Sequence, residues 1–492
     1  MHLRLQTAHF LPKPFPVKVI KLTLALILLL QIACFAEPAP GSKPNVLFIA
    51  VDDMNCWVGA LGIHPQAKTP NIDRLAARGM LFTRAYCASP LCNPSRIALV
   101  TSLRPSTTGV YSNQHRFRKF IPDVVTLPQY FRQNGYRVLG GGKVFDIQNQ
   151  TSDPKSWEEY FPIPPDDVKP SRDPDANKKP FGWGPLKATD DQMSDMKIAN
   201  WAVRHLADTN DRPLFLAVGF FKPHIPLRVP QKYFDMHPLD KIILPEVKQD
   251  DTDDLPPTGK LWANQAPGLK TGNHQMIVTN GLWKSAVQAY LATCSFSDAC
   301  VGRVLDAFDK SAYATNTIII LWSDNGWHLG EKLHWQKHVL WEEATHVPLA
   351  FVIPGLTHPY QRCSRIVSFL DIYPTMTELC GLQTPKNIEG VSFISLLRNP
   401  TAPWDRPAIS TYGPNNHAVR TDQWRYIHYA NGDEELYDEL TDPKEWNNVA
   451  NKTEYRAVKK HLTTFVPTLN VPDRLPQSDF NKKPWKSIAS ED

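Results

Sequence analysis

Several classes of protein are excluded by what this sequence lacks. Its 492 residues include 54 basic and 49 acidic residues, a net charge of +5 without any basic block, so nucleic-acid binding is not expected. The sequence contains no Gly-x-Ser-x-Gly motif and no Gly-rich phosphate loop ending in Lys-Ser or Lys-Thr, which removes two common signatures of hydrolases and nucleotide-binding proteins. It also contains no internal repeat and no low-complexity tract.

Long hydrophobic runs are also lacking. The apolar run at residues 22–33 is shorter than the roughly 20 residues of a membrane-spanning helix. It follows Lys13, Lys18 and Lys21 and leads to small residues ending at Ala36. This pattern predicts a signal peptide over residues 1–36 and a secreted or periplasmic mature protein without a stable membrane span. A membrane anchor is the alternative.

Cysteine is sparse and irregularly spaced. Seven cysteines remain once Cys34 is removed with the signal peptide, and their spacings do not match a zinc site. Export permits disulfides, but the odd number leaves at least one cysteine for another role. Cys294 and Cys300 are six residues apart in a helical stretch, so they point in different directions and should not pair. Apart from Cys92, we expect buried thiols or a structural bridge.

Strands alternate with helical stretches along most of the chain, whose 42% hydrophobic content suffices for more than one core. Continuous apolar runs predict buried strands, and amphipathic helices lie between them, which favours an α/β fold with a largely parallel sheet. After residue 400 short apolar runs predict a small antiparallel sheet followed by a helix. We therefore predict a catalytic domain over residues 37–400 and a smaller C-terminal domain over residues 401–492. The predicted strands of the large sheet include residues 45–51, 136–139, 213–219 and 317–322.

Polar residues follow these predicted strands. Ligands bind beyond the carboxyl ends of the strands in open α/β sheets, so the side chains should meet at one edge. Carboxylate and amide oxygens suit Ca²⁺ or Mg²⁺ rather than zinc, and lysines beside a metal indicate an anionic substrate such as sulfate or phosphate. Each strand end alone would be explained as well by a turn or a helix cap. The residues concerned are Asp52, Asp53, Lys143, Lys222, His224, Asp324 and Asn325.

The nucleophile missing from this set is supplied by Cys92-Asn93-Pro94-Ser95-Arg96. This segment resembles the formylglycine maturation signal of type I sulfatases, and the similarity extends over nearly the whole mature chain. Residues 142–145, 222–226 and 323–337 resemble the branch typified by iduronate-2-sulfatase. The resemblance implies an alkaline-phosphatase-like large domain and a smaller C-terminal domain. It also implies hydrolysis of sulfate esters of a saccharide, after a maturing enzyme has converted Cys92 to formylglycine.

The resemblance further implies a role for each site residue. Arg96 would orient the formylglycine, Lys143 and Lys337 would bind sulfate oxygens, and His224 would contact the sulfate and protonate the leaving alcohol. The predicted ligands of a Ca²⁺ ion are Asp52, Asp53, Cys92 in its modified form, Asp324 and Asn325.

Two positions depart from the family pattern. Asp146 stands where the resembled branch has a histidine that helps to deprotonate the second hydroxyl of the hydrated formylglycine. Asp146 could act as that base, or another residue such as His115 could assist. Ser102-Leu103 replaces a segment that often reads Gly-Arg, which should leave recognition of the maturation signal intact.

Some assignments stay open. Arg228, His417 and Arg420 could reach the mouth of the site and contact an acidic sugar, although surface salt bridges explain them nearly as well. A phosphatase or phosphonate-ester hydrolase would share the metal-binding strands, but would use Ser, Thr or an unmodified Cys92. A non-catalytic protein that binds sulfated glycans is the alternative outside enzymes.

Overall fold

The structure is a computed structural model that describes residues 43–146, 153–170, 173, 175–264 and 273–474. The predicted signal peptide at residues 1–36 lies outside these ranges. No helix within them is long and apolar enough to cross a membrane.

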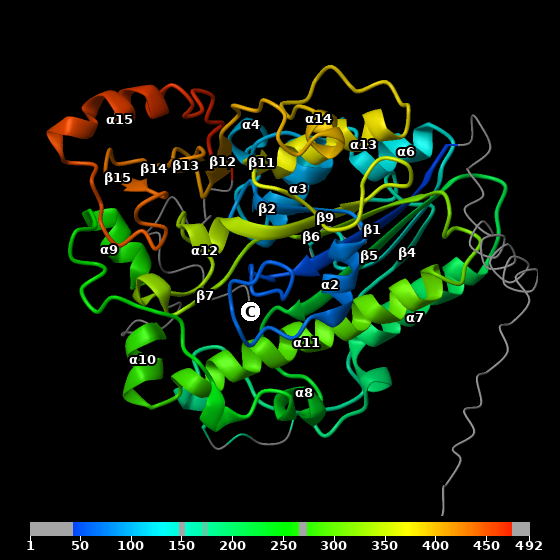
Figure 1. Ribbon diagram of the computed structural model, residues 1–492, viewed down its shortest axis with the longest axis horizontal. Coiled ribbons are helices and arrows are strands. Elements are labelled where there is room, and N and C mark those ends of the chain that lie inside the picture. Colours follow the sequence, from blue (N-terminus) through cyan, green and yellow to red (C-terminus); the bar gives the residue numbers. More distant parts are fainter. Residues whose placement is uncertain (1–42, 147–152, 171–172, 174, 265–272, 475–492) are drawn as a thin grey trace, which may run out of the picture. The chain divides into compact units, whose positions relative to one another are not determined.

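A nine-stranded sheet forms the centre of the fold (Figure 1). Strand β9 is antiparallel to both of its neighbours, and every other pairing in the sheet is parallel. Strand β11 (Val367–Ser368) also pairs with β2. The path across the sheet is β10 (Gln361–Cys363), β2 (Met80–Tyr86), β9 (His346–Val352), β6 (Thr317–Ser323), β1 (Asn45–Asp52), β5 (Leu214–Pro223), β3 (Arg137–Gly142) and β4 (Glu159–Phe161).

The central strands are continuously apolar because both faces of the sheet are covered. Side chains alternate along β1, so Leu47 and Ile49 enter one core and Val46 and Phe48 enter the other. The first face is covered by α2 (Pro70–Ala77), α7 (Ser194–Ala207), α8 (Gln231–Asp235) and α11 (Trp283–Phe308). The second is covered by α3 (Cys92–Thr101), α6 (Leu127–Gln133), α13 (Ile372–Leu379) and α14 (Ile394–Arg398).

A separate four-stranded antiparallel sheet follows, in the order in which its strands occur along the chain. Helix α15 (Arg456–Thr463) packs Leu462 against Val419 and Leu436 of this sheet. The boundary predicted at residue 400 stays a prediction. The strands are β12 (Ala408–Thr411), β13 (His417–Arg420), β14 (Trp424–His428) and β15 (Glu434–Asp438).

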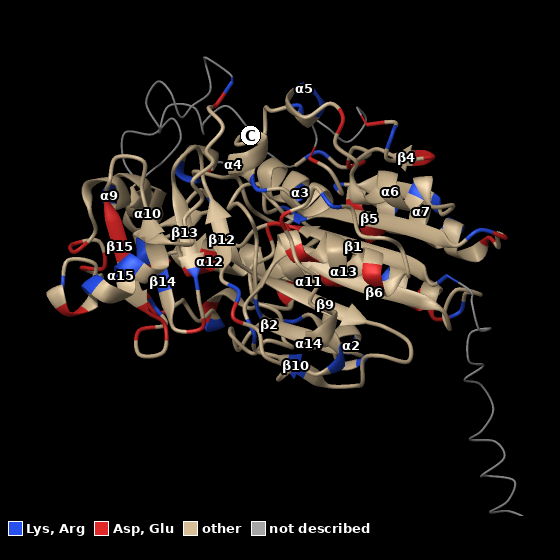
Figure 2. Ribbon diagram, turned by 90° about the horizontal axis from the view of Figure 1, so that it is seen from above, with Lys and Arg blue, Asp and Glu red and all other residues tan. Residues whose placement is uncertain are grey.

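Short elements connect these layers. They are α4 (Pro105–Thr108), α5 (Phe117–Phe120), α9 (Pro257–Ala263), α10 (Asn273–Thr279), β7 (His328–Leu329), β8 (Trp335–Gln336) and α12 (Glu342–Thr345). Basic and acidic residues are interspersed along the ribbon in Figure 2. The seven cysteines of the described ranges are all buried free thiols.

Candidate active site

The site begins where β1 ends. The pairing of β1 with β5 shifts between Val51 and Asp52, which brings Asp52 opposite Pro223. Asp53 follows with φ 55°, a left-handed conformation that is uncommon for aspartate and is often found at functional sites. Both carboxylates are fully buried, so their charge must be balanced within the site.

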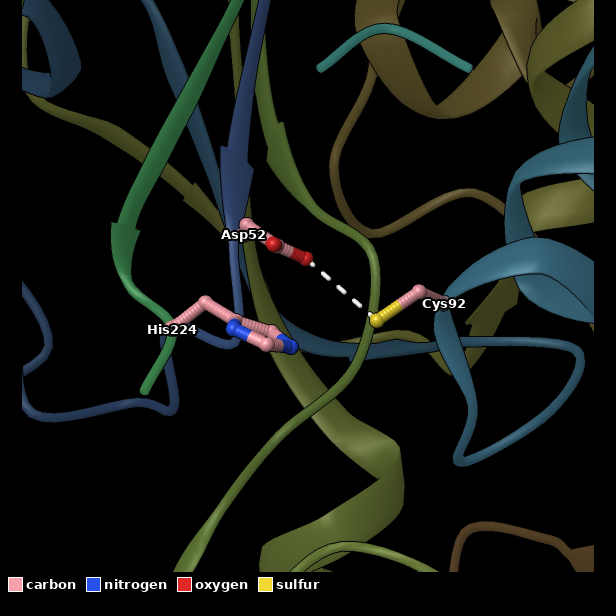
Figure 3. Close-up of side chains that lie close together, drawn as sticks. All are labelled: Asp52, Cys92 and His224. Carbon is pink, nitrogen blue, oxygen red and sulfur yellow. Dashed lines mark hydrogen bonds between the residues drawn. The ribbon is translucent and has the colours of Figure 1, made fainter. Parts of the chain in front are cut away.

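Cys92 is the first residue of α3 and is also fully buried. Its Sγ lies 3.5 Å from Asp52 Oδ1 and 3.9 Å from Asp53 Oδ1. Figure 3 shows its side chain pointing toward Asp52 and His224, which come from the ends of two neighbouring strands. Burial, reinforced by the charge of Asp52, raises the pKa of the Cys92 thiol well above its usual value.

Arg96 lies one helical turn after Cys92 and joins two strand ends. Its Nε donates to Asp324 Oδ2 at 2.8 Å, and its Nη2 donates to Asp52 Oδ1 at 3.0 Å. The same guanidinium donates to the carbonyls of Lys143 and Val144. Because this side chain is fully buried, it fixes the positions of both carboxylates relative to α3.

Two lysines lie near Cys92, one directly after β3 and one directly after β8. Lys337 Nζ lies 2.9 Å from Cys92 Sγ and donates to Asp53 Oδ1 at 2.7 Å. Lys143 Nζ lies 3.7 Å from the same Sγ and 2.5 Å from Asp52 Oδ2. Burial would raise the pKa of Asp52, but Lys143, His224, Arg96 and Lys337 together hold it well below its ordinary value.

The last residue of β3, Gly142, directly precedes Lys143 and must be a glycine. Its φ is +74°, and a Cβ there would collide with the backbone of Gly219 on β5. The close approach of these two strands therefore sets the direction in which the Lys143 side chain leaves the sheet.

His224 and Asp146 complete the predicted set. His224 Nδ1 lies 2.7 Å from Ile225 O, and its Nε2 lies 3.8 Å from Asp53 Oδ2. Asp146 is buried, and its Oδ1 lies 3.5 Å from Lys143 Nζ. The structure therefore brings together every residue that the sequence placed in the catalytic and metal sets.

The oxygen atoms of this set fit a hard cation. Ligand atoms of Asp52, Asp53, Cys92 and Asp324 lie within 4.8 Å of one another. Asn325 donates through Nδ2 to Asp53 Oδ1 at 2.7 Å, whereas its buried Oδ1 accepts no hydrogen bond from any described residue. Burial, together with the charges of Asp52 and Asp53, raises the pKa of Asp324 to about 7 despite Arg96.

The three residues proposed for the mouth of the site have different surroundings. Arg420 is buried and pairs with Glu342 and Glu439, each at 3.3 Å, so it supports the packing of the small sheet. His417 is fully buried between Thr411 and Asn470. Arg228 alone is half-buried and lines a cavity. Burial and internal partners therefore favour a structural role for Arg420 and His417 over contact with a sugar.

A C-terminal tail that the sequence did not reveal braces the loop beside Cys92. Val471 N donates to Ser106 O, and Tyr111 Oη donates to Val471 O, both at 2.8 Å. Asp473 Oδ1 lies 3.5 Å from His115 Nε2, while His115 Nδ1 accepts from Tyr111 N at 3.1 Å. The ring nitrogens of His115 thus face the tail and its own loop, which argues against the role of alternative base.

This braced loop holds the residue after Cys92. Asn93 Nδ2 donates to Ser112 O and to His115 O, both at 2.8 Å, and Asn93 N donates to Asn113 Oδ1 at 2.9 Å. The start of α3, and with it Cys92, is therefore positioned in part by residues near the end of the chain.

Comparison with known proteins identifies the family. The family model described as Sulfatase matches residues 44–382, well over half of the chain. This chain belongs to the sulfatase family. A second model, described as N-sulphoglucosamine sulphohydrolase, C-terminal, matches residues 330–471 of this sulfatase. The protein is accordingly a sulfuric ester hydrolase, and the predicted resemblance to type I sulfatases is confirmed.

Individual relatives agree with this assignment. A protein named Sulfatase from Formosa agariphila is 42% identical over 447 residues, covering 87% of both chains. Iduronate 2-sulfatase of Homo sapiens is 33% identical over 396 residues, covering 71% of both chains.

The fold is shared more widely. The crystal structure of the phosphonate monoester hydrolase of Agrobacterium radiobacter superposes with a TM-score of 0.73 at 21% identity, covering 86% of this sulfatase and 94% of that chain. Identity this low shows the fold alone. The predicted α/β fold, with its mostly parallel sheet and separate antiparallel sheet, is confirmed.

Proposed function

We propose that this sulfatase hydrolyses the sulfate ester of a saccharide through a formylglycine made from Cys92, with a calcium ion bound beside it. One observation carries the proposal. The Cys92 side chain lies buried at the start of α3, within 4 Å of two carboxylates and two ammonium groups. Such a position suits a nucleophile that must meet an anionic ester and a cation together.

The calcium ion would be held by Asp52, Asp53, Asp324 and Asn325, together with the modified Cys92. All of the unmodified ligands offer oxygen, which Ca²⁺ prefers, and the unpartnered Asn325 Oδ1 is an available ligand atom. Bound there, calcium would lower the pKa of the nucleophilic hydroxyl and neutralise charge on the sulfate.

Formylglycine solves a problem that an ordinary cysteine or serine would create, because either would form a stable sulfo-enzyme ester. Its hydrate carries two hydroxyls on one carbon, so that one can attack sulfur and deprotonation of the other expels sulfate. Arg96, which holds Asp52 and Asp324, would keep the hydrate in line with the sulfur atom.

The remaining side chains handle charge and protons. Lys143 and Lys337 would bind the sulfate oxygens and stabilise charge as the ester bond breaks. His224 Nδ1 contacts the carbonyl of Ile225, which can only accept a hydrogen bond. In the neutral ring the proton therefore sits on Nδ1, and the unprotonated Nε2 faces the site. Bound sulfate would favour protonation of Nε2, which could then donate to the leaving alcohol. Asp146, beside Lys143, would accept the proton of the second hydroxyl.

A saccharide is the proposed substrate because the human relative at 33% identity is named for iduronate, a sugar acid. The predicted signal peptide would direct the protein out of the cytoplasm, so we propose that hydrolysis takes place in a secreted or periplasmic protein. A formylglycine-generating or equivalent enzyme is then a required partner during synthesis.

The first experiment measures, by mass spectrometry, the mass of the peptide that contains Cys92. The protein is made in a host that has the maturing enzyme. Conversion of thiol to aldehyde is expected, and Cys92→Ala should release no sulfate from an aryl sulfate while its circular dichroism spectrum is retained. Sulfate release by the alanine variant would refute this mechanism.

A second pair of measurements separates the alternatives. Elemental analysis should find one calcium per chain and little zinc, whereas two metals or stoichiometric zinc would favour a phosphatase. Parallel assays on aryl sulfate, phosphate and phosphonate esters should show that the sulfate ester is preferred. An unmodified Cys92 together with saccharide binding and no turnover would favour a non-catalytic glycan-binding protein.

A further inference from the structure

A cavity of about 490 Å³ is lined in part by Phe221, whose ring also lies beside Lys143 of the candidate active site. Its lining includes residues between 163 and 170, the end of β5 and the segment that follows β5. Its lining includes Ile163, Pro164, Pro165, Phe221, Lys222 and Arg228. The walls thus combine apolar ring surfaces with two cationic side chains, a combination suited to an anionic sugar.

The Phe221 ring connects this cavity to the sulfate-binding lysine. Lys143 Nζ lies 5.0 Å from the ring centroid, and Lys222 Nζ lies 5.1 Å from it. The centroid of the His224 ring lies 4.7 Å from that of Phe221. The ammonium groups of Lys143 and Lys222 are therefore separated by at most the sum of these two distances to the ring. One or two sugar rings can cover such a span.

Lys222 is almost completely buried, and no carboxylate of the described residues lies within ion-pair distance of its Nζ. Its Nζ donates to His224 O at 3.1 Å and to Pro226 O at 2.6 Å, and it forms no ion pair with any residue of the described ranges. Burial lowers its pKa to about 8. The carboxylates of Asp195, Asp166 and Asp52 offset this burial only in part, so an anion in the neighbouring cavity would stabilise the buried ammonium further.

Arg228 offers the geometry for holding such an anion. Within the described parts of the chain its guanidinium forms no ion pair, and Asp173, a nearby carboxylate, is paired with Lys179 at 2.7 Å. Gly182 leaves room for it, since a Cβ there would lie 3.1 Å from Arg228 Nη2. Its planar N–H groups are thus available for a carboxylate or sulfate.

Asp166 is the acidic residue in the lining and only partly offsets these charges. One of its carboxylate oxygens accepts from Ser194 N at 2.7 Å, so it is committed to the cavity wall. Because Lys222 and Arg228 also belong to the lining, it keeps an excess of positive charge.

We propose that this cavity binds a second anionic group of the saccharide substrate, a carboxylate or a second sulfate, through Arg228 and Lys222. The inference rests on the proposed function and narrows it to saccharides that carry an anion besides the ester being cleaved. Sulfate hydrolysis would then select for acidic sugars without any change to the residues around Cys92.

The test compares Arg228→Gln with the unaltered protein on four substrates. They are a sulfated disaccharide with a uronic carboxylate, a disulfated disaccharide without a carboxylate, a monosulfated neutral disaccharide and an aryl sulfate. Loss of a charge-assisted hydrogen bond should lower kcat/KM for one or both of the first two by about 10- to 100-fold relative to the aryl sulfate. The affected substrate identifies the anion as carboxylate or sulfate.

Controls keep the outcomes distinct. Arg303→Gln removes an exposed arginine from α11 and should leave kcat/KM for all four substrates unchanged. Equal losses for Arg228→Gln on all four substrates, or no loss on any, would overturn the proposal.

Calorimetry of disaccharide binding to full-length Cys92→Ala protein, with and without Arg228→Gln, does not depend on turnover. Weaker binding of the acidic disaccharide alone supports the cavity even if hydrolysis is never detected, in which case only the proposed reaction fails. Unaltered binding of both acidic disaccharides overturns the cavity assignment even if hydrolysis is robust.

Discussion

Replacing Asn325 by aspartate should make the stability of this sulfatase far more dependent on calcium. Asn325 Nδ2 donates to Asp53 Oδ1 at 2.7 Å and to Gly326 O at 3.0 Å. In Asn325→Asp this donor becomes a carboxylate oxygen that faces another carboxylate and a carbonyl. Without a cation the variant therefore loses two hydrogen bonds and gains a repulsion in a fully buried site.

The magnitude follows from this geometry. Two unit charges at this separation repel by about 6 kcal/mol at an effective dielectric constant of about 20. Protonation limits the cost, because neutralising an aspartate of ordinary pKa at pH 7 requires about 4 kcal/mol. For a protein of this size about 1 kcal/mol corresponds to about 1 °C, so Tm in a chelator should fall by about 4 °C.

Calcium should reverse this loss. In the unaltered protein, calcium at a hundredfold excess over Kd should stabilise the fold by about 2.7 kcal/mol, or about 3 °C. In Asn325→Asp the cation meets a fourth carboxylate, so the calcium-dependent rise in Tm should be about 6 to 7 °C.

Differential scanning calorimetry at pH 7, in chelator and in calcium, measures both quantities. Asn280→Asp makes the same change of charge at an exposed position, where Nδ2 donates to Met276 O, and serves as the matched control. The reasoning is refuted if the two variants lose equal stability in chelator. It is refuted equally if calcium raises Tm no more in Asn325→Asp than in the unaltered protein.

Three further outcomes are expected. Lys337→Gln removes the ammonium 2.9 Å from Cys92 Sγ, so kcat on an aryl sulfate should fall about 100- to 1000-fold; a loss under tenfold at equal conversion of Cys92 would contradict its role. Lys332→Met breaks a buried ion pair with Asp251 at 2.9 Å and should lower the free energy of unfolding by about 3–5 kcal/mol in urea denaturation, and adding Asp251→Leu should restore most of it. Burial lowers the pKa of His237 to about 4, so the folded state resists protonation of this ring. The free energy of unfolding relative to His237→Gln should be constant above pH 6.5 and should fall by up to about 1.4 kcal/mol per pH unit between pH 6.5 and about 4. A constant difference in Tm between the two proteins across that range would exclude this effect.

The sequence predicted the parts of the fold that local pattern determines. Strands β1, β5 and β6 are buried on both faces, so their continuous apolar runs were visible without any tertiary information. The site was equally visible because two of these strands end at or directly before its polar residues, which are Asp52, Asp53, Asp324 and Asn325. The antiparallel direction of β9 left no such mark, since an apolar run looks the same in either direction.

Long-range pairing explains what the sequence could not show. Arg228 and Arg420 look alike as isolated basic residues, but Arg420 meets Glu342 from a distant part of the chain, whereas Arg228 meets no such partner within the described residues. His115 likewise faces Asp473, more than 350 positions later. Such contacts depend on how the small sheet and the tail pack, which no local pattern encodes.

Protein synthesis begins at the N-terminus, so Cys92 leaves the ribosome long before Val471 and Asp473 do. Until those two residues emerge, the loop at residues 106–115 lacks the contacts that they make with Ser106, Tyr111 and His115. Cys92 is fully buried in the finished fold, so the proposed maturing enzyme would have to reach it before the chain has folded. The late synthesis of Val471 and Asp473 would therefore lengthen the interval in which the proposed aldehyde could form on the nascent chain.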